Sequence, residues 1–238
     1  MRTVVILTAT VKPQTSLNLK RDSESERLRD YEDAIKFYLE KLTDKTDLIV
    51  VENSNSIMQL QDKIKFNSRL RLISAPLDSD SSFKGKSEGE LAMLRFLSAN
   101  GHLNEYEFCW KITGRLKVLN VNKIIESAEG YEIFVYRFKD GHSCDSRFFG
   151  MKTSIFQKFV NNPVKFDEIT WNLKTIDQIE FRSLENYLAV FGARMHEAGF
   201  RIGCSEIAPR FKGYSASTGK QLDSKKSKIH YFLTKNLR

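Results

Sequence analysis

The sequence opens with short apolar runs on either side of one amphipathic segment, and this pattern restricts the fold more than any other feature. The runs TVVILT (3–8) and DLIVVEN (47–53) are bounded by polar residues, as buried strands are. Between them, residues 22–42 place apolar side chains at three- and four-residue spacings, which is typical of a helix that buries one face. Strand, helix and strand in that order predict a βαβ unit and a parallel sheet.

Later runs extend this unit into one α/β domain. We expect strands over 69–74 and 105–112, and helices over 56–66 and from residue 87 to about Asn100. Beyond residue 118 more aromatic strands, over 131–138, 146–152 and 200–207, alternate with helices over 153–161 and 183–198. The prediction is a single domain over 1–238, with a mostly parallel half-Rossmann sheet flanked by helices in 1–118 and a mixed half in 119–238.

Composition and charge narrow the class of protein. Hydrophobic residues make up 41% and charged residues 29%, which is ordinary for a soluble globular chain. No apolar run is long enough to cross a bilayer, and the N-terminus lacks the features of a signal peptide. The three cysteines lack the spacing of metal ligands, so we expect a reduced, cytoplasmic protein without a zinc site. Residues 201–238 hold nine Lys/Arg against two acids, so this segment is either an anion-binding region or a solvated basic tail.

Ligands in open parallel sheets bind beyond the carboxyl ends of the strands, so the residues after each strand are the first candidates. For a nucleoside pocket these are the small polar residues after the first two strands: Thr8, Ala9, Thr10, Glu52, Asn53 and Ser54. The fourth strand ends in KITGR, which supplies Lys111, Thr113, Gly114 and Arg115. An arginine can bind two phosphate oxygens through its planar fork, and a glycine lets backbone approach them. The alternative is that Lys111 and Arg115 only point to solvent at a strand end.

Two loops offer further cations. Lys84 precedes a helix start at which an anion could bind. The alternative explanation for this loop is that Glu88 and Glu90 only favour the first helical turn. The stretch PRFKGYSASTGK (209–220) combines cations, hydroxyls and glycines that could wrap a diphosphate, with Lys212, Ser215, Ser217 and Lys220 as candidates. A disordered end is the alternative for this stretch.

Several short stretches of the sequence together resemble bacterial GT-A-type glycosyltransferases of lipopolysaccharide or capsule synthesis. These stretches are ILTAT, IVVENSNS, KGKSEGE, WKITGRLKV, DSRFFGMKT, SLENYL and PRFKGYSASTGK. The resemblance implies transfer of a sugar from a nucleotide-sugar donor to a surface glycan or lipid-linked glycan acceptor. It also implies an Asp-x-Asp metal motif after the fourth strand, where this chain reads Ile112-Thr113-Gly114. We therefore expect no metal cofactor, with Arg115 and Lys111 neutralising the leaving diphosphate. Asp78-Ser79-Asp80 has the Asp-x-Asp spacing and is the competing site for Mn²⁺ or Mg²⁺.

An inverting transfer needs a general base beside the acceptor hydroxyl. The resemblance implies that this base is an acidic residue at the start of a helix in the second half of the chain, and Glu185 fits that position. Asp145 is the alternative base or acceptor-binding carboxylate. The basic and aromatic residues 225–238 could contact the inner face of the cytoplasmic membrane or form a last strand. Two other classes stay open: a non-catalytic nucleotide-binding protein, and a nucleic-acid-binding module, although the sequence holds no nucleic-acid-binding motif.

Overall fold

The computed structural model describes residues 2–13, 20–75, 86–136, 144–166, 180–181, 183–204, 207–215 and 219–222. Several predicted features lie outside these ranges: Lys84, Ser217, the Asp78-Ser79-Asp80 motif and the basic residues 225–238. None of the helices within the ranges is long and apolar enough to cross a membrane.

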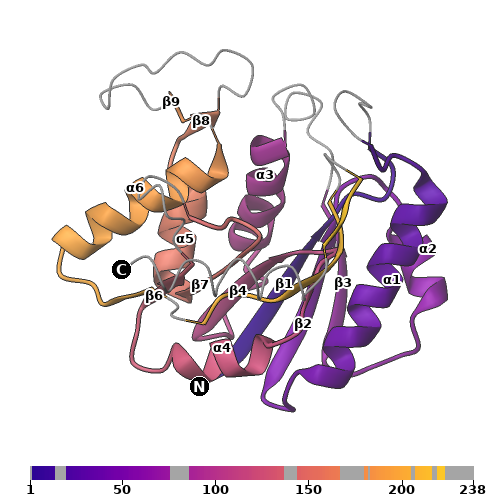
Figure 1. The fold of residues 1–238 in the computed structure, drawn as a ribbon, viewed down its shortest axis with the longest axis horizontal. Coiled ribbons are helices and arrows are strands. Elements are labelled where there is room, and N and C mark those ends of the chain that lie inside the picture. Colours follow the sequence, from indigo (N-terminus) through magenta and orange to yellow (C-terminus); the bar gives the residue numbers. More distant parts are fainter. Residues whose placement is uncertain are drawn as a thin grey trace.

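The first half of the chain builds the parallel part of a seven-stranded sheet (Figure 1). Its strands are β1 (Thr3–Ala9), β2 (Thr46–Glu52), β3 (Leu70–Ser74) and β4 (Phe108–Thr113), and its helices are α1 (Glu24–Lys41), α2 (Ile57–Lys63) and α3 (Lys86–Ala99). β1 pairs in parallel with both β2 and β4, and β2 pairs in parallel with β3. The predicted βαβ unit is therefore confirmed.

The second half continues the same sheet, whose strand order is β10-β6-β7-β4-β1-β2-β3. It contributes α4 (Val121–Ser127), β6 (Ile133–Val135), β7 (Phe148–Lys152), α5 (Thr153–Asn161), α6 (Leu184–Glu197) and β10 (Ile202–Cys204). β7 runs antiparallel to β4 and β6, whereas β10 is parallel to β6. The sheet is mostly parallel with helices on both faces, so the predicted fold class is confirmed.

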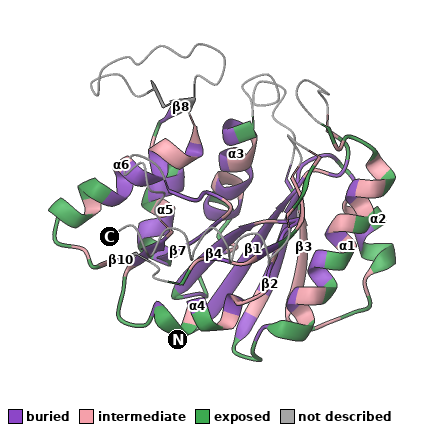
Figure 2. Cartoon of the chain, viewed as in Figure 1, coloured by how far each residue is buried: buried purple, intermediate pink, exposed green. Residues whose placement is uncertain are grey.

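Alternating side chains divide the core into two layers. Val4 and Ile6 of β1 face the layer built with α3, α5 and α6, whereas Val5 and Leu7 face the layer built with α1, α2 and α4. β1, β2 and β4 are almost entirely buried, the edge strand β3 is partly exposed, and the helices carry their exposed residues on their outer faces (Figure 2). This double burial explains why the strands read as continuous apolar runs in the sequence.

Short elements in the second half were not predicted. A three-stranded sheet of order β12-β11-β5 joins Lys117–Val118 (β5) to Phe211–Tyr214 (β11) and Gln221–Leu222 (β12), while β8 (Lys165–Phe166) pairs with β9 (Glu180–Phe181). Strands of two to four residues are too short to show periodicity. A solvated or disordered tail is thus wrong for 211–214 and 221–222, because these residues pair as strands and Phe211 is buried.

Some predicted boundaries were also wrong. β4 starts at Phe108 rather than at residue 105, because residues 101–106 form turns in which the amide of Tyr106 donates to the carbonyl of Leu103. Within the described residues, β6, β7 and β10 are shorter than the predicted runs 131–138, 146–152 and 200–207. Core-facing aromatic residues continue past the paired backbone, so apolar pattern alone overestimates strand length.

The order of the strands places β1 at a switch point. The chain proceeds from β1 to β2 and β3 on one side, and then crosses to β4 on the other side. Thr8 and Thr113 are register partners at the adjoining carboxyl ends of β1 and β4. A crevice at such a position is where open α/β sheets bind ligands.

Candidate active site at the carboxyl ends of β1 and β4

Lys111 has a fully buried side chain near the end of β4, on the side of Phe149. Its Nζ lies 2.6 Å from Glu90 Oε1, donates to the carbonyl of Ser146 at 2.6 Å, and reaches Thr113 Oγ1 at 3.3 Å. The idea that Lys111 points to solvent is therefore wrong. A buried ammonium requires a carboxylate, and α3 supplies it.

Glu90 connects α3 to two strand ends. Besides Lys111, its Oε1 accepts from Thr8 Oγ1 at 2.7 Å and lies 3.5 Å from Thr113 Oγ1. Its neighbour Glu88 forms an ion pair with Arg95 at 2.9 Å. The explanation that both acids only favour the first helical turn is therefore incomplete, since each also makes a specific ion pair.

Glu185 lies in the first turn of α6 and joins the same group of side chains. Its Oε1 accepts from Ser146 Oγ at 2.6 Å, and the Ser146 carbonyl is the one that Lys111 contacts. Burial by itself would raise the pKa of Glu185. Hydrogen bonds from Ser146, its own backbone and Ser183, together with the charge of Lys111, outweigh burial, so the pKa of Glu185 is lowered. The carboxylate is thus oriented and ionised. We call the following residues the charge cluster: Thr8, Glu90, Lys111, Thr113, Ser146 and Glu185.

Asp145, the alternative base, is fully engaged. Arg147 donates from its backbone amide and Nε to Oδ1, at 3.0 and 2.8 Å, and from Nη2 to Oδ2 at 2.6 Å. The Arg147 guanidinium also lies 4.3 Å from the ring of Phe211. Asp145 is 1% exposed, so its position suits anchoring Arg147 against β11 rather than accepting a proton from a substrate.

Arg115 follows β4 and is buried without a hydrogen-bond partner for two of its nitrogens. Arg115 is only 7% exposed, and its Nε and Nη1 have no hydrogen-bond acceptor in the described part of the chain. The idea that Arg115 points to solvent is wrong as well. A buried guanidinium normally makes several hydrogen bonds, so these two donors need an explanation.

Arg27 of α1 lies beside Arg115. It is 4% exposed and donates from Nε to the carbonyl of Thr10 at 2.7 Å, from Nη2 to that same carbonyl, and from Nη1 to the carbonyl of Arg21 at 3.2 Å. Burial lowers the pKa of Arg27; Tyr31 opposes this effect, and the positive charge of Arg115 adds to it. The positive charge of Arg115 therefore disfavours the charged form of Arg27. We call Arg27 and Arg115 the arginine pair.

Gly114 is required by packing between the strand ends. Its amide donates to the carbonyl of Thr8 at 3.0 Å, and an added Cβ would lie 2.5 Å from that oxygen and 3.1 Å from the Tyr31 ring. The tight approach holds the end of β4 against β1 and against α1, and it carries the chain directly to Arg115.

The predicted nucleoside residues join the ends of β1 and β2. Glu52 is fully buried, and its carboxylate accepts from the amides of Val11, Ser54 and Ser56 and from the Ser54 hydroxyl. Thr10 Oγ1 donates to Asn53 Oδ1 at 2.7 Å, whereas Ala9 belongs to the apolar core. Glu52 thus holds the loop in shape, while Thr10 and Asn53 bring hydroxyl and amide groups to the strand ends.

The hairpin of β11 and β12 lies next to the arginine pair. A Cβ on Gly213 would lie 2.7 Å from the carbonyl of Arg115, and the guanidinium of Arg21 stacks 4.0 Å from the ring of Tyr214. Lys212 and Lys220 are exposed, and the amide of Ser215 donates to the carbonyl of Lys220. Three of the four hairpin candidates are therefore described, and their backbone lies beside the end of β4.

Sequence reasoning missed Arg27, Tyr31, Glu90 as an ion-pair partner, Ser146 and Arg147. A signal existed for the first two, because Arg27, Tyr31, Ile35 and Tyr38 lie on the buried stripe of one helix, where a charged residue is unusual. Ser146 and Arg147 carried none, since their role comes from contacts with α6 and β11 far away in the sequence.

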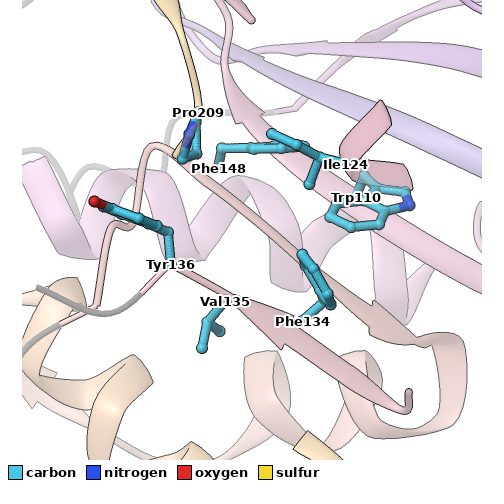
Figure 3. A pocket seen from close by; sticks show the side chains of 7 residues that line it. All are labelled: Trp110, Ile124, Phe134, Val135, Tyr136, Phe148 and Pro209. Carbon is cyan, nitrogen blue, oxygen red and sulfur yellow. The ribbon is translucent and has the colours of Figure 1, made fainter. Parts of the chain in front are cut away.

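Two other hollows are lined by different residues. One is an open hollow at the amino ends of β2 and β3, lined by Asp44, Phe66, Asn67, Ser68 and Arg69. The one in Figure 3, between Trp110, Phe134, Tyr136 and Pro209, has apolar walls and leaves no space for a water molecule. Among the described residues, no group of three His, Cys, Asp or Glu side chains could hold a metal ion.

No protein-family model matches the sequence, and no curated protein matches it at the threshold that we required. Solved structures do resemble it. A candidate nucleotide-diphospho-sugar transferase from Desulfovibrio desulfuricans G20 matches over 86% of this chain and 79% of its own, with 10% identity and a TM-score of 0.52. CMP:2-keto-3-deoxy-manno-octonic acid synthetase in complex with CTP matches over 99% of this chain and 100% of its own, with 9% identity and a TM-score of 0.50. At these identities the likeness concerns the fold, so the chain has a GT-A-like, nucleotide-diphospho-sugar transferase-like fold.

Proposed function

We propose that this protein is a glycosyltransferase that moves a sugar from a nucleotide-sugar donor to the hydroxyl of a bacterial surface glycan or lipid-linked glycan. The observation that carries the proposal is Glu185, an ionised carboxylate that accepts a hydrogen bond from Ser146 and is stabilised by the charge of Lys111 near the end of β4. The fold it shares with a candidate nucleotide-diphospho-sugar transferase supports the donor class.

In the proposed reaction Glu185 takes the proton of the acceptor hydroxyl, while that oxygen attacks the anomeric carbon of the sugar and the nucleotide leaves. Ser146 and Lys111 orient the base and keep it ionised before the acceptor arrives. Thr10 and Asn53 would contact the nucleoside, and Arg115 with the hairpin 212–220 would lie near the departing phosphates. We also propose that the enzyme acts at the cytoplasmic face of the membrane, where residues 225–238 would contact anionic lipid.

The first test is a panel of nucleotides and nucleotide sugars, assayed by thermal shift with EDTA or with Mn²⁺. A nucleotide sugar and its nucleotide should both raise the melting temperature, and the donor that binds should then release nucleotide slowly by hydrolysis. If no nucleotide binds, the proposal fails. If RNA or DNA binds instead, a nucleic-acid-binding module is the better description.

Glu185→Gln should lower turnover by roughly 10²–10⁴-fold, because the amide cannot accept the proton. Donor binding in the thermal-shift assay should persist, since the substitution keeps the shape of the side chain. The matched control is Glu197→Gln, at the exposed far end of the same helix. Wild-type turnover in Glu185→Gln would remove Glu185 from the role of base.

A second candidate is nucleotidyl transfer to a sugar. It is favoured by the fold shared, over nearly the whole of both chains, with a synthetase in complex with CTP. The two reactions differ in product: glycosyl transfer releases a nucleotide, whereas nucleotidyl transfer from a nucleoside triphosphate releases pyrophosphate. Analysis of the released phosphate compound decides between them.

A further inference from the structure

Two buried arginines, Arg27 in α1 and Arg115 just after β4, form no ion pair with a carboxylate among the described residues, and the positive charge of Arg115 acts on Arg27. Within the described residues neither Arg27 nor Arg115 forms an ion pair, whereas Lys111, Arg21, Arg95 and Arg147 all do. Removing a charge from water without a partner costs several kcal/mol, and two neighbouring like charges add repulsion. Hydrogen bonds to the carbonyls of Thr10 and Arg21 offset part of this cost for Arg27, whereas Nε and Nη1 of Arg115 have no such compensation among the described residues.

The two arginines differ in what their donors do. Arg27 is occupied, because it holds the loop after β1 through the carbonyl of Thr10 and lies along Tyr31. Arg115 keeps Nε and Nη1 without acceptors although the residue is more than nine-tenths buried. Nε and Nη1 point to different sides of the planar guanidinium, so satisfying both of them takes two separate acceptor oxygens, as the two phosphate groups of a diphosphate can supply.

We propose that the arginine pair is a binding site for the diphosphate of a nucleotide, with Arg115 as the direct ligand and Arg27 as the second charge, and that no divalent cation is needed there. A group with two or more negative charges matches the pair, whereas a single carboxylate would neutralise only one of the two cations. The inference rests on the proposed function only for the nucleotide. The phosphate site itself follows from the burial and charge of both arginines and from the unpaired donors of Arg115.

The chain packed over Arg115 must move for the ligand to reach it. β11 is the described segment next to it, since Gly213 lies against the Arg115 carbonyl. β11 forms two register pairs with β5, and Phe211 anchors it in the core layer of α1, α2 and α4. Access of a ligand to the buried guanidinium therefore requires movement of the chain around the end of β4.

The test uses Arg115→Met in the full chain with inorganic pyrophosphate and EDTA. Pyrophosphate should raise the melting temperature of the wild type by an amount on the order of 5 °C at saturation. Arg115→Met should abolish that shift and, without ligand, should melt at the same or a higher temperature, because an apolar side chain of similar length replaces an unpaired buried charge. A structural role for Arg115 predicts the opposite, a lower melting temperature.

Arg71→Gln is the matched control, because it removes one positive charge from an arginine that pairs with Glu105. It should keep the pyrophosphate shift. A wild type that responds to pyrophosphate only with Mn²⁺, or an Arg115→Met variant that responds like the wild type, would overturn the proposal. Pyrophosphate binding without any sugar transfer would instead overturn the proposed glycosyltransferase and leave the phosphate site standing.

Discussion

At the scale of single residues, Ser146 sets the protonation of the proposed base. Its hydroxyl donates to Glu185 and helps to lower the pKa of that carboxyl, so the base stays ionised in mildly acidic solution. Activity that needs the ionised base is lost as pH falls through this pKa. Ser146→Ala should raise the pKa and move the acidic limb of the kcat–pH profile to higher pH, while Ser146→Thr keeps the hydroxyl and should keep the profile. An unchanged limb in Ser146→Ala would show that the bond does not control the base. The same residue-scale reasoning covers Arg115, whose two buried donors have no acceptor in the described part of the chain and carry our proposal of a phosphate ligand.

At the scale of elements, β11 depends on one glycine. Gly213 has a φ of 138°, a region that side chains other than glycine rarely adopt, and a Cβ there would meet the Arg115 carbonyl. Gly213→Val should therefore displace β11 from β5, and limited proteolysis within 207–222 should become faster while the rest of the domain stays folded. Gly89→Ala is the control: it lies in α3 with nothing near its Cβ position, so it should raise stability by about 0.5–1 kcal/mol. Equal protease resistance in Gly213→Val and wild type would contradict the role given to this strand.

At the scale of the whole molecule, the two halves share one sheet. β7 from the second half pairs with β4 from the first, and α5 and α6 cover the core layer that Val4 and Ile6 begin. We therefore expect one cooperative unfolding transition, with equal calorimetric and van't Hoff enthalpies, for residues 1–238. The fragment 1–118 should not fold alone, because β4 would become an open edge and Trp110 would lose the ring of Phe148, 5.0 Å away. Separate transitions, or a folded fragment, would show two independent domains.

Local sequence determined the elements of the first half and their order. The three- and four-residue spacing of Tyr31, Ile35 and Tyr38 is enough to predict α1, and β-branched runs are enough to predict β1 and β2, because period and polarity act between neighbouring residues. The βαβ order then implies a parallel sheet and places ligands at the strand ends. Thr10, Asn53, Lys111 and Arg115 could be named from that reasoning alone.

Only the tertiary structure decided what those side chains do. Lys111 lies in β4 and Arg115 lies in the turn that follows it, yet Lys111 is neutralised by Glu90 from α3 while two donors of Arg115 have no acceptor among the described residues. Lys111 leaves the sheet on the face that α3 covers, whereas Arg115 follows the close packing of Gly114 against Thr8 and Tyr31, and the helices at both places are fixed by packing between residues far apart in the chain. Sequence therefore specifies which charges reach the edge of the sheet, whereas long-range packing specifies which of them remain available to a ligand.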